Sequence, residues 1–148
     1  MSTRSYIAKK QPDDTFKAIY CHFDGYPGGV GQTLVDSFTD ENKVDKLLEL
    51  GALSYLRNDI ETQNHFQSYP MRGSEFELEN VTMAYHRDRG DELEINEFSN
   101  LEEMLEFFSD SWGEYLYLYD IDNKWLVKNN ENDFFMEVDE VLVESNNE

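Results

Sequence analysis

Apolar residues recur at every second position in several stretches of this chain, which is the pattern of half-buried β-strands. Near the start, the pattern predicts strands over 5–10 and 15–23, and Pro12-Asp13-Asp14 between them fits a hairpin turn. The second of these strands places four residues on one face: Phe16, Ala18, Tyr20 and His22.

The second half of the chain predicts further hairpins. Strands are expected over 81–88 and 93–98, paired across residues 89–91, and over 114–119 and 124–128, paired across Asp122-Asn123. Another strand is expected over 134–137. Residues 139–144 fit either a helical turn or an edge strand, because they are rich in valine but Val138, Val141 and Leu142 also have helical spacing.

Three segments have the spacing of amphipathic helices. One follows the glycines of 25–31 and extends to Phe38; the second covers 41–50, after Thr39 or Asp40 as N-cap and before Gly51 as C-cap. The third covers 101–109, after Ser99 or Asn100. Between the second and third helices, 52–56 fits a short strand or turn, and the polar, aperiodic residues 57–80 predict a long, partly mobile loop.

Together these elements predict a single α+β domain over residues 1–148, with a mixed or antiparallel sheet of hairpins and about three helices. The aromatic content of 14% argues for a packed core, since disordered acidic chains usually lack aromatics. The chain has no run of about 18 apolar residues and no apolar stretch after Met1 that would form a signal peptide. Cys21 is the single cysteine, which excludes an internal disulfide, and we expect a soluble cytoplasmic protein without a membrane partner.

Charge is distributed unevenly along the chain. The formal net charge is −20, and residues 91–148 hold eighteen Asp and Glu against only Lys124 and Lys128. Such a surface repels nucleic acid and anionic membranes, so its expected partners are basic: a nucleic-acid-binding protein, a basic peptide or a cation. The alternative is that the acidity serves only solubility.

The helix predicted over 101–109 concentrates this charge. Glu102, Glu106 and Asp110 recur at every fourth position, with Glu103 beside them, which places carboxylates about 6 Å apart along one face. That spacing is comparable to the distance between consecutive phosphates of one DNA strand. We therefore predict a partner-binding surface that consists of the helix acids and three acids near them: Glu102, Glu103, Glu106, Asp110, Glu114, Asp120 and Asp122.

No complete catalytic signature is present, so we expect neither an enzyme nor a cofactor. Two His-x-Asp triplets give an alternative ligand or metal site formed by His22, Asp24, His86 and Asp88. Residues i and i+2 of a strand point the same way, so neighbouring strands would aim all four side chains at one divalent cation. The other interpretation is two unrelated strand ends whose side chains bond the backbone.

Two further patterns have a structural and a functional interpretation. The glycines of 25–31 precede a helix, as in phosphate-binding loops, but the lysine of a Walker A loop is missing, and a sharp strand-to-helix connection explains them equally. The alternating Tyr115, Tyr117 and Tyr119 are typical of a packed sheet face, and exposed tyrosines beside carboxylates would instead suit a protein interface.

Two blocks resemble a family of small uncharacterised phage and prophage proteins. They are Tyr20-Cys21-His22-Phe23-Asp24-Gly25-Tyr26, followed by Gly29-Val30-Gly31, and Ala84-Tyr85-His86-Arg87-Asp88-Arg89-Gly90. The resemblance covers these blocks closely and most of the chain loosely. It implies a genomic setting and no mechanism, although small acidic phage proteins as a class include anti-restriction and anti-CRISPR inhibitors that imitate DNA.

From the charge pattern and this setting we expect an acidic DNA mimic that inhibits a CRISPR effector or restriction enzyme in the host cytoplasm. The runner-up is a small-ligand or metal-binding module that uses the glycine loop and both triplets. A third possibility is an adaptor with an ordinary protein interface. The sequence determines neither the partner nor the oligomeric state.

Overall fold

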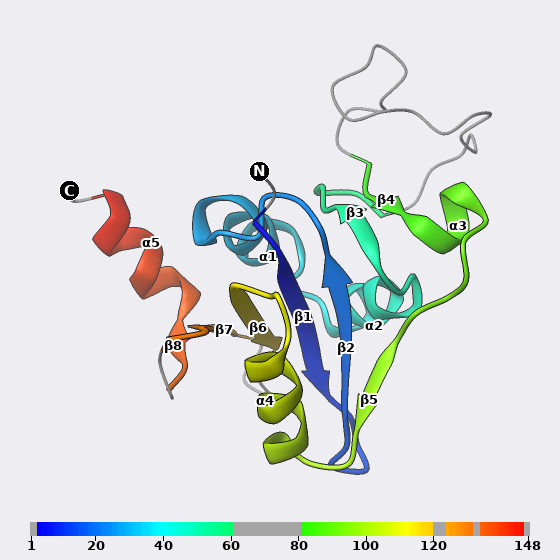
Figure 1. Ribbon diagram of the computed structural model, residues 1–148. Helices are drawn as coiled ribbons and strands as arrows, with labels where there is room; N and C mark the ends of the chain where they lie inside the picture. Colours follow the sequence, from blue (N-terminus) through cyan, green and yellow to red (C-terminus); the bar gives the residue numbers. More distant parts are fainter. Residues whose placement is uncertain (1–2, 61–80, 120–123, 132–133, 147–148) are drawn as a thin grey trace.

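A computed structural model describes residues 3–60, 81–119, 124–131 and 134–146, and the statements below concern these residues. One mixed eight-stranded sheet organises them (Figure 1). Its strands are β1 Ser5–Lys10, β2 Phe16–Cys21, β3 Leu53–Tyr55, β4 Met83–Ala84, β5 Asn96–Phe98, β6 Tyr115–Tyr119, β7 Trp125–Asn129 and β8 Met136–Glu137. The expected α+β class is confirmed.

Two antiparallel hairpins form the centre of the sheet. The strand order is β4-β3-β2-β1-β6-β7-β8, with β1 antiparallel to β2 and β6 antiparallel to β7. The hairpins join through a parallel pairing of β1 with β6, which places Ile7 opposite Tyr117. As expected, the first hairpin turns at 12–14, where Asp14 adopts a positive φ of 68°.

The helices cover the two faces of the sheet unequally. They are α1 Gln32–Ser37, α2 Glu41–Glu49, α3 Tyr85–Arg89, α4 Leu101–Asp110 and α5 Val138–Asn146, and a π-helical turn, η1 Pro27–Gly31, leads into α1. Buried residues of η1, α1, α2 and α5 pack with one face of the sheet, which includes Ile7, Ile19 and Tyr117. On the other face, α4 packs with Ala8, Ala18 and Leu116.

The predicted hairpin of 81–88 with 93–98 is wrong. Only β4 is extended, because Tyr85–Arg89 turns into α3, where the Asp88 carboxylate accepts a hydrogen bond of 2.8 Å from the Ala84 amide. Gly90 then ends α3 in a left-handed conformation with φ 77°. The second predicted strand is shorter than expected, and β5 pairs with the start of β2 rather than with β4.

The last segment, which the sequence left open, is helical. Val138 and Leu142 are one turn apart on α5, and both are buried in the core that contains Ile7, Ile19 and Tyr117. The hydrophobic spacing therefore outweighs the strand preference of the valines, because only a helix brings these two positions to the same face.

A buried lysine attaches α2 to the sheet. Lys9 is only 5% exposed, and its ammonium donates to Glu41 Oε1 at 2.9 Å and to Asp45 Oδ1 at 2.6 Å. Burial disfavours the charged ammonium, but the hydrogen bonds and charges of Asp45 and Glu41 outweigh it and raise the pKa of Lys9. The positive charge of Lys9 is therefore paired with two carboxylates within the fold.

Candidate functional site

The acidic row lies on a helix with a well-formed start. Asn100 Oδ1 accepts from the Glu103 amide at 2.9 Å, and Glu103 Oε2 accepts from the Ser99 amide at 2.7 Å. This pair resembles a capping box, except that the Glu103 carboxylate accepts from the amide of Ser99, one residue before the N-cap Asn100. Glu103, which was predicted to bind a partner, thus uses one carboxylate oxygen at the start of its own helix.

The remaining acids of α4 are exposed and unneutralised. Met104 and Phe108 face the sheet at 1% exposure each, whereas Glu102, Glu106 and Asp110 lie on the exposed side. In the described part of the chain, no Lys or Arg nitrogen lies within 4 Å of these three carboxylates.

The other predicted acids have different positions. Glu114 is exposed and follows the loop after α4, where its amide donates to the Arg4 carbonyl at 2.8 Å. Asp120 and Asp122 fall outside the described residues. The Lys128 ammonium is 5.3 Å from the centroid of the Phe108 ring. Phe108 lies on the side of α4 opposite the carboxylates, so Lys128 does not neutralise them. The exposed row on α4 therefore consists of Glu102, Glu106 and Asp110, and Glu114 is an exposed acid beyond the end of the helix.

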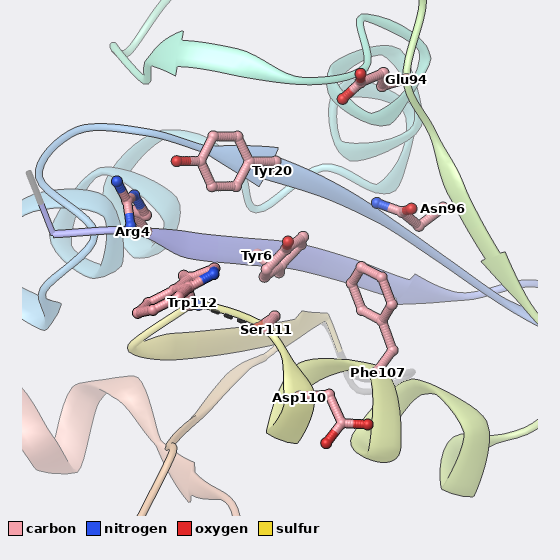
Figure 2. A pocket seen from close by; sticks show the side chains of 10 residues that line it. Arg4, Tyr6, Tyr20, Glu94, Asn96, Phe107, Asp110, Ser111 and Trp112 are labelled. Atoms are coloured by element: carbon pink, nitrogen blue, oxygen red, sulfur yellow. Dashed lines mark hydrogen bonds between the residues drawn. The ribbon is translucent and has the colours of Figure 1, made fainter.

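Beyond the end of α4, the same face of the sheet is left open. Here an open depression of about 900 Å³ exposes side chains of β1 and β2 (Figure 2). Its aromatic and charged lining comes from the sheet, from α4 and from the loops: Arg4, Tyr6, Tyr20, Glu94, Phe107 and Trp112. Asp110 lies on its rim, so the acidic row ends at this depression.

Aromatic rings pack against one another in tilted and edge-to-face contacts at the floor of this depression. The Tyr6 centroid is 5.6 Å from that of Tyr20 and 5.3 Å from that of Phe107, with the latter pair nearly perpendicular at 82°. Phe107 in turn is 5.2 Å from Phe98 of β5. Such tilted and T-shaped contacts favour a fixed arrangement of rings over a loosely packed one.

The polar groups of this region carry both signs of charge. Burial raises the pKa of Tyr6, and the nearby Glu94 carboxylate raises it further against an opposing hydrogen bond with Ser111. Burial also raises the pKa of Tyr20, while the Arg4 guanidinium opposes this. The Tyr20 hydroxyl is 2.6 Å from His22 Nδ1, and burial together with Arg4 lowers the pKa of His22. Arg4 thus makes one end of the depression positive, and Glu94 and Asp110 make other parts of its rim negative.

The four residues of the alternative metal site have separate roles. His22 pairs with Tyr20, and Asp24 is in a left-handed conformation with φ 59° while its carbonyl accepts from the Val30 amide. His86 is exposed, with Nδ1 2.7 Å from the Asp91 carbonyl. Where the chain is described, no three His, Cys, Asp or Glu side chains come together as metal ligands.

Asp88 and Arg87 instead form a backbone clamp. The Asp88 side chain is 1% exposed and accepts from both the Ala84 amide and Arg87. Arg87 also donates to the carbonyls of Ile60 and Thr82, which flank residues 61–80 in the sequence. Within the second block of the resemblance, Arg87 and Asp88 therefore have structural roles.

The glycine block and the tyrosines are also structural. A Cβ on Gly29 would lie 2.3 Å from the Asp24 carbonyl oxygen, so this position requires glycine, and the amides of Gly25, Gly29 and Val30 all donate to backbone carbonyls. Tyr117 is fully buried and donates to the Gly25 carbonyl at 2.7 Å. These contacts favour the strand-to-helix connection over a phosphate loop.

Sequence analysis did not identify the aromatic depression. Two signals were available: Tyr20 and His22 continue the face of Phe16 and Ala18 with amphipathic side chains, and Trp112 interrupts a polar stretch. The missing information was tertiary, because only the position and length of α4 determine which part of that face stays open.

Comparisons of this chain with protein-family models, with curated proteins and with solved structures found no match. The part of the chain that the structure describes contains no helix long and apolar enough to cross a membrane.

Proposed function

We propose that this protein inhibits a nucleic-acid-targeting defence protein of a phage host, such as a CRISPR effector or restriction enzyme, by occupying its DNA channel. The carboxylates of Glu102, Glu106 and Asp110 take the place of consecutive phosphates, and Glu114 extends the row. Lysines and arginines that normally hold DNA bind these carboxylates, in the cytoplasm of the host cell. The resemblance to phage and prophage proteins supplies the biological setting.

The observation that supports this proposal most is the exposed, unneutralised row on α4. Three carboxylates at i, i+4 and i+8 repel one another by a few tenths of a kcal/mol per pair, and no described lysine or arginine relieves them. Elsewhere in the fold, Lys9 and Lys124 are paired with acids. A surface that served solubility alone would not require acids in one row on a rigid helix.

The proposal predicts fast, salt-sensitive association, because unlike charges steer the encounter and salt screens them. The test measures DNA cleavage by a panel of purified CRISPR effectors and restriction enzymes, with this protein added at equimolar concentration. We expect the wild type to inhibit cleavage, and we expect the variant Glu102→Lys/Glu106→Lys/Asp110→Lys to lose this inhibition.

A matched control reverses three exposed acids on the opposite side of the sheet, Glu49, Asp139 and Glu140, which changes the net charge equally. This control is expected to inhibit almost as well as the wild type. Inhibition that survives reversal of the α4 row at low salt contradicts the proposal. Inhibition that persists at about 0.5 M salt favours a mainly apolar adaptor interface instead.

A further inference from the structure

A single exposed tryptophan separates two depressions at the end of the acidic row. Trp112 is 84% exposed, whereas the other tryptophan, Trp125, is buried at 3%. One side of Trp112 borders the aromatic depression of about 900 Å³, and the other borders a second of about 570 Å³ that Tyr26, Glu114 and Glu131 help to line. We call these two depressions together the Trp112 groove.

The loop that presents Trp112 is held on both sides. Ser111 Oγ donates to the Phe108 carbonyl at 2.7 Å and accepts from the Gly113 amide at 3.1 Å, and the Asn130 side chain donates to the Gly113 carbonyl. A Cβ on Gly113 would be 3.0 Å from the Tyr6 ring, so glycine allows the loop to lie directly on that ring. The indole is thus presented from a fixed loop, and little backbone entropy is lost when a partner binds it.

The groove is negatively charged overall. Glu94 and Asp110 line the first depression and Glu114 and Glu131 line the second, against a single cation in the two linings, Arg4. In Figure 2, Arg4 lies at the Trp112 end, while Glu94 and Asp110 are nearer the Phe107 end. The Trp112 groove therefore combines exposed aromatic side chains with four carboxylates and one guanidinium.

We propose that the Trp112 groove binds an extended, arginine-containing segment of the partner protein, with a guanidinium stacked on the indole. This inference rests on the proposed function and extends it, because the groove continues the α4 row. A guanidinium is planar, stacks on aromatic faces and pairs with carboxylates, so it matches both features of the groove. A lysine ammonium is more strongly hydrated and cannot stack as a plane.

Single-stranded nucleic acid is the competing occupant, since bases also stack on exposed aromatic side chains. Charge opposes it here: phosphates would meet four carboxylates and one arginine in a protein of net charge −20. The charge complementarity favours a basic peptide segment.

The test uses the full-length protein and three fluorescein-labelled probes: hexa-arginine, hexa-lysine and a ten-nucleotide oligothymidylate. Anisotropy at about 0.15 M salt measures their affinity for the wild type, for Trp112→Ala and for the control Phe134→Ala. Phe134 is 57% exposed and lines neither depression. Neither substitution changes the net charge, so differences between the variants report stacking and not bulk attraction.

The expected result is that Trp112→Ala weakens hexa-arginine binding about tenfold, as the loss of a cation–π contact predicts. Phe134→Ala stays within about twofold of the wild type, and hexa-lysine binds more weakly and responds less to Trp112→Ala. Unchanged hexa-arginine affinity in folded Trp112→Ala overturns the inference, and so does oligothymidylate binding that requires Trp112. The intact CD spectrum and the emission of buried Trp125 verify folding.

A second comparison separates this inference from the proposed function. Glu102→Lys/Glu106→Lys alters the row without changing a residue that lines the groove. If Trp112→Ala inhibits the nuclease as well as the wild type while the row variant does not, the groove proposal fails and the proposed function stands. If Trp112→Ala alone loses hexa-arginine binding and the row variant still inhibits, the groove stands and DNA imitation fails.

Discussion

Neutralising the end of the acidic row should make the protein more stable. In the variant Glu106→Gln/Asp110→Asn, two like-charge contacts disappear, because Glu106 lies one turn from both Glu102 and Asp110. Each such pair costs about 0.2–0.5 kcal/mol. Asp110 is also the last residue of α4, where the negative end of the helix dipole disfavours a carboxylate by about 0.3–1 kcal/mol.

Together these contributions predict a gain of about 1 kcal/mol in the free energy of unfolding, which corresponds to a rise of about 2–4 °C in Tm for a chain of this size. Urea unfolding followed by far-UV CD measures the gain at two salt concentrations. The gain should be largest at 0.01 M salt, where the Debye length is about 30 Å, and should largely vanish at 1 M, where it is about 3 Å.

Glu103→Gln is the control, because it removes one negative charge from the same helix at its other end. Its carboxylate caps the N-terminus of α4 and lies at the favourable end of the dipole, so we expect no gain and a loss of up to about 1 kcal/mol. If Glu106→Gln/Asp110→Asn is no more stable than the wild type at 0.01 M salt, the carboxylates of the row do not repel one another measurably, and the row no longer favours a binding role over solubility.

Three further predictions follow from the rest of the fold. Gly29→Ala should destabilise the protein by about 2 kcal/mol or more in urea unfolding, because its Cβ would lie 2.3 Å from a backbone oxygen. The control Gly28→Ala should have a stability close to that of the wild type, because the nearest neighbour of its Cβ would be 3.8 Å away. Burial raises the pKa of the Cys21 thiol to about 12, so a thiol reagent at pH 8 should label Cys21 only as fast as the protein opens, and rapid stoichiometric labelling would contradict its burial. Arg4→Met should raise the pKa of His22 toward its ordinary 6.5 in an NMR titration, since burial and the Arg4 charge both lower it; an unchanged pKa would show that burial acts alone. In the wild type, the stability that neutral His22 contributes is present above about pH 6.5 and is lost as the pH falls through its folded-state pKa.

Local patterns predicted most of the elements because those elements depend on near neighbours. The hairpin of β1 and β2, the Asp40 cap of α2 and the Asn100 cap of α4 all follow from residues within a few positions of each other. The acidic face of α4 was predictable for the same reason, because helix geometry alone fixes which positions share a face.

The errors arose where distant contacts decide. The strand expected over 81–88 fails because Arg87 binds the carbonyl of Ile60, 27 positions away, in addition to the local hydrogen bond from the Ala84 amide to Asp88. β5 pairs with β2 for a similar reason, since the free edge of β2 beside Phe16 is a tertiary feature. The aromatic depression could not be predicted either, because it exists only where α4 leaves the sheet uncovered.

Competition between this protein and DNA tests the central claim most directly. The measurement takes an effector or restriction enzyme that the protein inhibits and follows their complex while duplex DNA with the effector's target sequence is added. If the α4 carboxylates occupy the DNA channel, the apparent Kd of the complex rises in proportion to the DNA concentration, and DNA and protein are never bound together. A ternary complex of effector, DNA and this protein, with an unchanged Kd, would contradict the account.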